Sequence, residues 1–127
     1  MNLFDDALKI AIVGSRTRDC RDAVRELVYS LPANATIVSG GARGVDTYAV
    51  ECAVERGMTV IEYRPHITPS MDYRAICAEL FRRNGDIARA ADICHAFPDA
   101  DKFALATGGT YDAVQRFRRL GKPVEVH

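Results

Sequence analysis

The sequence predicts an α/β fold of the Rossmann-like type, a three-layer sandwich with a mainly parallel sheet of about five strands between helices. Two observations carry this prediction. Short apolar runs typical of buried strands alternate with segments of helical periodicity. A glycine-rich turn, residues 39–44, then joins a strand to a helix, where α/β proteins hold phosphate. Alternation of this kind produces parallel strands joined by right-handed crossovers.

Strands and helices are expected in strict alternation along the chain. In the first half they are a strand at 9–14, a helix at 19–31, a strand at 36–39, a helix from Val45 to Arg56 and a strand at 58–63. In the second half they are a helix at 72–91, a strand at 92–97, a helix at 111–120 and a strand at 123–126. Apolar runs predict the strands, and apolar residues at helical spacing predict the helices.

Two features interrupt the second half. The pair Asn84–Gly85 predicts a break in the helix at 72–91, because glycine is a poor helix former. Residues 98–107 are expected to form a long loop between the fourth strand and the last helix. A loop at this edge of a sheet is either a lid over the binding face or a mobile insertion with no role.

The composition favours a single domain, residues 1–127, in a reducing compartment. Lysine plus arginine and aspartate plus glutamate both number 17, so no overall positive charge favours a long nucleic-acid backbone as partner. The 4 cysteines form no C-x-x-C pair and no cluster with histidine, which predicts reduced thiols and no metal site. Residues 1–6 do not resemble a signal peptide, and no apolar run reaches membrane-spanning length. We therefore expect a cytoplasmic protein without a membrane partner.

The unusual residues follow the ends of expected strands. Gly14-Ser15-Arg16 follows the first strand, and the run Ser39 to Gly44 follows the second. In parallel sheets ligands bind beyond the carboxyl ends of the strands, and glycines let backbone amides approach an anion closely. No Walker A loop is present, and Ser39 replaces the first glycine of the dinucleotide fingerprint. These turns predict a nucleotide-like ligand without predicting a conventional dehydrogenase.

Several ordered motifs together resemble the SLOG superfamily. They are Gly14-Ser15-Arg16, the run Ser39 to Asp46, the pair Arg83-Asn84, and Gly108-Gly109-Thr110 followed by Asp112. The closest similarity is to the small YspA-like branch, in a superfamily that includes DNA-processing protein A and the Lonely Guy-type phosphoribohydrolases. The resemblance runs from about Lys9 to Val126. Members hydrolyse nucleoside monophosphates, sense nucleotides such as ADP-ribose, or bind single-stranded DNA on one scaffold.

The resemblance implies a set of ligand-binding residues. The residues expected to contact phosphate or ligand are Gly14, Ser15, Arg16, Ser39, Gly40, Gly41, Ala42, Arg43, Gly44, Asp46, Asn84, Gly108, Gly109 and Thr110. Arg16 and Arg43 are either phosphate ligands or solvated surface arginines. Asp46 sits in a first helical turn, where a carboxylate braces the loop more readily than it binds an anion. Tyr48, Tyr73, Phe103 and Tyr111 are candidates to stack on a base.

The catalytic residues implied by the resemblance are Arg83 and Asp112. Arg83 matches an arginine of the Lonely Guy-type enzymes, and Asp112 falls where those enzymes carry a glutamate. A carboxylate stabilises the positive charge that develops on ribose when an N-glycosidic bond breaks. Ala113 replaces the second acid of that family, and Asp112 is also a favourable charge in the first turn of a helix.

The sequence thus predicts a module that binds a nucleotide or nucleotide-derived metabolite and requires no other cofactor. The alternatives are a phosphoribohydrolase that cleaves nucleoside 5′-monophosphates and a protein that binds single-stranded DNA. A homodimer is also expected, because related proteins often complete their pocket with a neighbouring chain. The arginines at 82–83 and 116–119 are either its seam or an exposed basic face.

Overall fold

A computed structural model describes residues 8–127 of the chain. The expectation about a signal peptide at residues 1–6 falls outside this part. Within residues 8–127, no helix has both the length and the apolar character that a membrane span requires.

The fold is an all-parallel five-stranded sheet with the strand order β3-β2-β1-β4-β5. The strands are β1 (Lys9–Gly14), β2 (Thr36–Ser39), β3 (Thr59–Glu62), β4 (Ile93–Phe97) and β5 (Val124–Val126). Each begins and ends within two residues of its expected position, because each is a short apolar run between turn-forming residues. The predicted α/β fold class is therefore confirmed.

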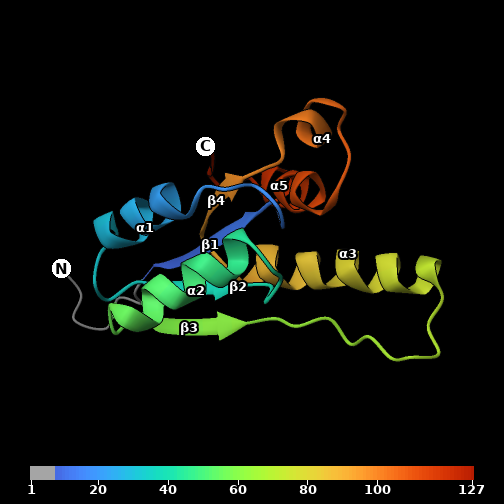
Figure 1. Cartoon of the computed structure of the whole chain (residues 1–127), viewed down its shortest axis with the longest axis horizontal. Helices are drawn as coiled ribbons and strands as arrows, with labels where there is room; N and C mark the ends of the chain where they lie inside the picture. Colours follow the sequence, from blue (N-terminus) through green and yellow to red (C-terminus); the bar gives the residue numbers. More distant parts are fainter. Residues whose placement is uncertain (1–7) are drawn as a thin grey trace.

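Helices cover both faces of the sheet (Figure 1). They are α1 (Arg21–Ser30), α2 (Val45–Glu55), α3 (Tyr73–Ala90), α4 (Ala100–Ala104) and α5 (Gly109–Arg119). Alternate residues of β1 face opposite sides: Ile10 and Ile12 pack under α1 and α2, whereas Ala11 and Val13 pack under α3 and α5. Burial of both faces explains why the central strands β1, β2 and β4 read as continuous apolar runs.

The helix α3 differs from the prediction, because it continues without a break through Asn84 and Gly85. Both residues are buried against α5. A Cβ atom at Gly85 would lie 3.3 Å from a guanidinium nitrogen of Arg116 on α5, so glycine here permits close packing. The two helices gain contact area where the sequence suggested a helix end, and tertiary packing overrides the weak helix propensity of glycine.

The connection after β4 also differs from the predicted loop. Residues 98–107 contain the short helix α4, which begins after Asp99. The Asp99 carboxylate accepts hydrogen bonds from the amides of Asp101 and Lys102, both at 3.1 Å. This cap organises the segment that was expected to be irregular. In Figure 1, α4 stands above the start of α5, while the first half of α3 and the loop before it extend beyond the sheet.

Candidate ligand pocket

A pocket of about 660 Å³ opens at the carboxyl end of β1, between the loop before α2 and the helices α3, α4 and α5. Its walls include eleven of the residues implied by the resemblance, namely Gly14, Ser15, Arg16, Ala42, Arg43, Asp46, Arg83, Asn84, Gly108, Gly109 and Thr110. Ser39, Gly40, Gly41, Gly44 and Asp112 are not among the lining residues. The volume lies within the range usual for small-ligand sites.

The turn after β1 is held rigidly against the start of α2. The hydroxyl of Ser15 accepts hydrogen bonds from the amides of Thr17 at 3.1 Å and Arg18 at 3.0 Å. The Ser15 carbonyl accepts the amide of Val45 at 3.1 Å. Gly44 has a φ of 77°, and a Cβ atom there would come within 2.7 Å of the Arg16 Cα. Only glycine fits this crossing, which leaves the exposed Arg16 at the pocket wall.

The loop before α2 is braced by its own carboxylate. Asp46, only 5% exposed, accepts the amide of Ala42 at 3.2 Å. Burial raises the pKa of Asp46 to about 6, against the lowering effects of the amides of Ala42 and Gly40 and of the Arg83 guanidinium. Because this carboxylate accepts hydrogen bonds from loop amides, fewer amides remain to bind a ligand anion. The hydroxyl of Ser39 accepts the Gly41 amide at 3.1 Å and fixes the loop further.

Arg83 reaches the same loop from α3. Its guanidinium donates hydrogen bonds to the carbonyls of Gly40 and Tyr63, the latter at 3.4 Å. The side chain is 7% exposed, and burial lowers the pKa of Arg83, although the nearby Asp46 carboxylate opposes this. A Cβ atom at Gly40 would lie 2.7 Å from the Arg83 Cζ, which accounts for glycine at that position. Arg83 therefore lines the pocket while it holds the loop to α3.

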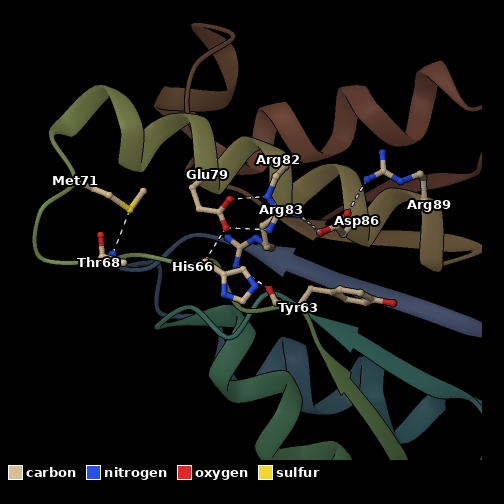
Figure 2. Close-up of polar contacts among 9 residues, drawn as sticks. All are labelled: Tyr63, His66, Thr68, Met71, Glu79, Arg82, Arg83, Asp86 and Arg89. Atoms are coloured by element: carbon tan, nitrogen blue, oxygen red, sulfur yellow. Dashed lines mark hydrogen bonds and ion pairs between the residues drawn. The ribbon is translucent and has the colours of Figure 1, made fainter.

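The neighbouring Arg82 belongs to a separate set of contacts, on the side of α3 that faces the loop leading into this helix (Figure 2). It bonds to Glu79 at 2.6 Å and to Asp86 at 2.8 Å. Glu79 also accepts the amide of His66 at 2.6 Å, and these donors lower the pKa of Glu79 to about 2. The Glu79 carboxylate thus fastens the loop that leads into α3.

Asn84 lies between the two residues expected to be catalytic. Its amide oxygen accepts a hydrogen bond from Arg83 Nε at 3.2 Å, and its Nδ2 donates to Asp112 Oδ2 at 3.1 Å and to the Gly109 carbonyl at 3.2 Å. Arg116 Nε also donates to Asp112 Oδ2, at 2.8 Å. The Asp112 carboxylate is thus turned toward partners on α3 and α5, and the acidic residues that line the pocket in the described chain are Asp46 and Asp99.

The start of α5 presents backbone amides to the pocket. Gly108 is the N-cap, with a φ of 92° and no side-chain cap, and Gly109 and Thr110 line the pocket after it. The amides from Gly109 to Tyr111 precede the first helical hydrogen bond, which Asp112 donates to the Gly108 carbonyl at 3.1 Å. Unpaired amides and the positive end of a helix dipole attract anions in general.

An apolar wall completes the pocket. Three of the four aromatic candidates, Tyr73, Phe103 and Tyr111, line it, whereas Tyr48 packs under the guanidinium of Arg21. Sequence reasoning missed the other lining residues of α3 and α4, which are Ile76, Cys77, Leu80, Phe81, Ile87 and Lys102. A signal was present in the apolar spacing 73, 76, 77, 80 and 81, which continues one face of α3 beyond the part that covers the sheet.

Comparison with known proteins identifies the family of this chain. The sequence model of DNA recombination-mediator protein A matches residues 2–66. The chain belongs to this family. The match confirms the predicted relationship to the SLOG superfamily, which includes DNA-processing protein A, whereas the similarity to the YspA-like branch stays a prediction. No curated protein matches the chain significantly.

Solved structures share the fold of this chain. DNA processing protein A from Streptococcus pneumoniae superimposes with a TM-score of 0.73 over 94% of this chain at 21% identity. The chain spans 50% of the length of that protein. The C-terminal domain of a hydrogenase from Pyrococcus furiosus superimposes with a TM-score of 0.56 at 12% identity, over 94% of this chain and 90% of that domain. At these identities the structural likeness shows the fold alone.

Proposed function

We propose that this chain binds a nucleotide or nucleotide-derived metabolite in the pocket, with the phosphate at the start of α5. The observation that carries the proposal is a single pocket with anion-binding groups and an aromatic wall. The amides of Gly109 and Thr110 and the exposed guanidinium groups of Arg16 and Arg43 supply the attraction for phosphate.

The two helix starts at the pocket are not equivalent as phosphate sites. At α2, the Asp46 carboxylate already accepts a loop amide, and its negative charge would repel a second anion. At α5, the corresponding acid Asp112 is paired with Arg116 and points to Asn84. We therefore place the phosphate at α5 and assign the loop before α2 the role of a rigid wall.

The aromatic wall suits a base or nicotinamide-like ring. The rings of Phe103 and Tyr111 pack edge to face, with centroids 5.5 Å apart, and Tyr73 is 83% exposed on α3. Aromatic faces stack on any nucleobase without reading its hydrogen-bonding edge. This wall supports a nucleotide ligand without choosing the base.

A charge placed at Gly109 tests the proposal. Gly109 is the first residue of α5, and a Cβ atom there meets nothing within 4 Å, so both Gly109→Asp and Gly109→Asn fit the fold. Purified protein is incubated with nucleoside monophosphates, ADP-ribose, cyclic ADP-ribose and NAD, and retained and released species are identified by native mass spectrometry. We expect an intact nucleotide on the wild type and on Gly109→Asn, and a loss of about tenfold or more in affinity for Gly109→Asp, since the added carboxylate faces the phosphate.

Two results would count against this function. Equal retention by Gly109→Asp and Gly109→Asn would exclude phosphate binding at α5. Release of free base and ribose phosphate would instead establish a phosphoribohydrolase, and Asp112→Ala would then test its carboxylate. No retained or altered nucleotide would leave the DNA-binding candidate in its place.

The family assignment favours single-stranded DNA as a second candidate ligand. The family and the pneumococcal protein are named for DNA recombination and DNA processing. Arg16 and Arg43 are exposed at the pocket rim and provide a phosphate-binding edge. This candidate predicts affinity for oligothymidylate that rises with length and falls steeply with salt, measured by fluorescence anisotropy. Affinity that is independent of length and weakly salt-dependent would exclude it.

We also propose a cytoplasmic homodimer, for which the arginine positions give partial support. Arg82 and Arg116 form ion pairs within the chain. Of the arginines expected at the dimer interface, the exposed Arg118 and Arg119 are therefore the candidates for contact with a second chain. Free cysteines in the described residues suit a reducing compartment. Light scattering after gel filtration, with an Arg118→Glu/Arg119→Glu variant as the comparison, tests the dimer. A monomeric wild-type protein would exclude it.

A further inference from the structure

A histidine-rich cluster lies at the edge of the sheet formed by β4 and β5, outside the ligand pocket. The cluster consists of His95, Glu125 and His127, and none of the three lines the pocket. One possible ligand atom from each residue lies within 4.8 Å of the others. His95 Nδ1 is 2.9 Å from His127 Nε2 and 3.7 Å from Glu125 Oε2, and His127 Nε2 is 4.0 Å from Glu125 Oε1.

Sheet geometry brings these three side chains together. His95 of β4 is the register partner of Glu125 of β5, so the two side chains lie side by side on one face. His127 follows two residues later, and its amide donates to the Ala96 carbonyl at 2.8 Å, which continues the strand pairing. Alternation along a strand therefore places Glu125 and His127 on the same face. The sequence did not reveal this cluster, because His95 is 30 residues before Glu125 and no spacing rule joins the two strands.

Other contacts hold the imidazole of His127 in position. Its ring stacks on Phe97 with centroids 4.4 Å apart and planes 8° from parallel. Arg18 donates a hydrogen bond to the His127 carbonyl at 2.8 Å. His95 is buried, whereas Glu125 is 66% exposed and leaves a route for an ion from solvent. Two of the three groups are therefore fixed, and the third is free to close on a bound ion.

We propose that His95, Glu125 and His127 form a binding site for a divalent transition-metal ion of the zinc type. Two imidazole nitrogens and one carboxylate are a ligand set that zinc uses with a fourth position left for water. Tetrahedral bonds of about 2.0–2.2 Å separate neighbouring ligand atoms by about 3.3–3.6 Å. The separations of 2.9, 3.7 and 4.0 Å need only small side-chain movements to reach that geometry. Imidazole ligands disfavour Mg²⁺ and Ca²⁺.

Bound metal would join β5 to β4 through side chains at the edge of the sheet. The strand β5 has 3 residues and pairs only with β4 among the described strands. An ion that binds the folded chain and not the unfolded chain raises the melting temperature, by an amount that grows with the logarithm of its concentration relative to the dissociation constant. This coupling supplies a second readout that does not depend on any activity of the pocket.

The test is a calorimetric titration of Zn²⁺ into protein that carries no polyhistidine tag, with the melting temperature followed in parallel. We expect one Zn²⁺ per chain and a raised melting temperature, and no binding of Mg²⁺. Glu125→Gln keeps the size of an exposed side chain and removes the charged ligand. Loss of an outer-shell partner typically costs about 10–100-fold in metal affinity, so loss of this ligand predicts a loss of at least about tenfold. His127→Ala should reduce the affinity for Zn²⁺ more than Glu125→Gln does.

Matched variants separate this site from surface histidines and thiols. His66→Ala removes an exposed histidine that is outside the cluster, and Cys77→Ser removes the most accessible thiol, so both should bind Zn²⁺ like the wild type. Circular dichroism checks that each variant is folded. The proposal is overturned if the wild type shows no saturable binding, if Glu125→Gln binds as tightly as the wild type, or if His66→Ala or Cys77→Ser removes the site.

Discussion

The helix starts of α2 and α5 look alike in sequence and differ in what they can bind. Each begins after an N-cap glycine with positive φ, 77° at Gly44 and 92° at Gly108, and neither has a side-chain cap. Each carries an aspartate in its first turn, Asp46 in α2 and Asp112 in α5. Asp46 turns back and accepts a loop amide, while Asp112 pairs with Arg116 along its own helix. A glycine-rich helix start therefore identifies an anion site only when no carboxylate of the chain already occupies it.

Replacing each N-cap glycine by alanine should give the largest difference in stability between the two helix starts. Positive φ costs a non-glycine residue about 1–3 kcal/mol at either position. At Gly44 a Cβ atom also meets backbone atoms of Ser15 and Arg16, whereas at Gly108 it meets only the Lys102 side chain, at 3.8 Å. Urea unfolding should show Gly44→Ala destabilised by at least about 3 kcal/mol and Gly108→Ala by about 1–2 kcal/mol. Equal losses would contradict the tight crossing at α2.

Asp46, the buried acid of α2, should give the next largest effect, a dependence of the free energy of unfolding on pH. The pKa of Asp46 is raised from 3.8 to about 6, so the folded state holds this proton more tightly than the unfolded state. The resulting stabilisation is complete below about pH 3.8 and is lost as the pH rises through about 6. Relative to Asp46→Asn, the wild type should lose up to about 3 kcal/mol between about pH 4 and pH 6. Parallel stability curves for the two proteins would contradict a buried, titrating Asp46.

The sequence predicted the strands and most helices because their apolar spacing is local information. The sequence could not predict the role of Gly85. In an isolated helix a glycine lowers the stability of the helix, and it is favourable only where another helix, here α5, packs closely against it. The sequence left two roles open for Asp46, because the surroundings of its carboxylate include Arg83, which is 37 positions away in the sequence and close in space. The helix α4 was within reach of the sequence, because Asp99 is a strong N-cap residue.

The carboxylate of α5 should give the smallest effect. Asp112→Asn weakens a partly exposed pair with Arg116, and such pairs contribute about 0.5–1 kcal/mol. Asp112 does not line the pocket, so nucleotide affinity should stay unchanged. Urea unfolding and calorimetry with ADP-ribose measure the two quantities. A large fall in affinity with little change in stability would show that Asp112 faces the ligand after all.

The most direct test compares the backbone amides of the two helix starts in one experiment. Amide resonances of ¹⁵N-labelled protein are followed by NMR at about pH 7.5, where Asp46 is ionised, during a titration with ADP-ribose. Phosphate at α5 predicts saturable shifts largest at Gly109, Thr110 and Tyr111, with smaller shifts at Gly40 and Ala42. Larger shifts at Gly40 and Ala42, or no saturable shift at either helix start, would contradict the account.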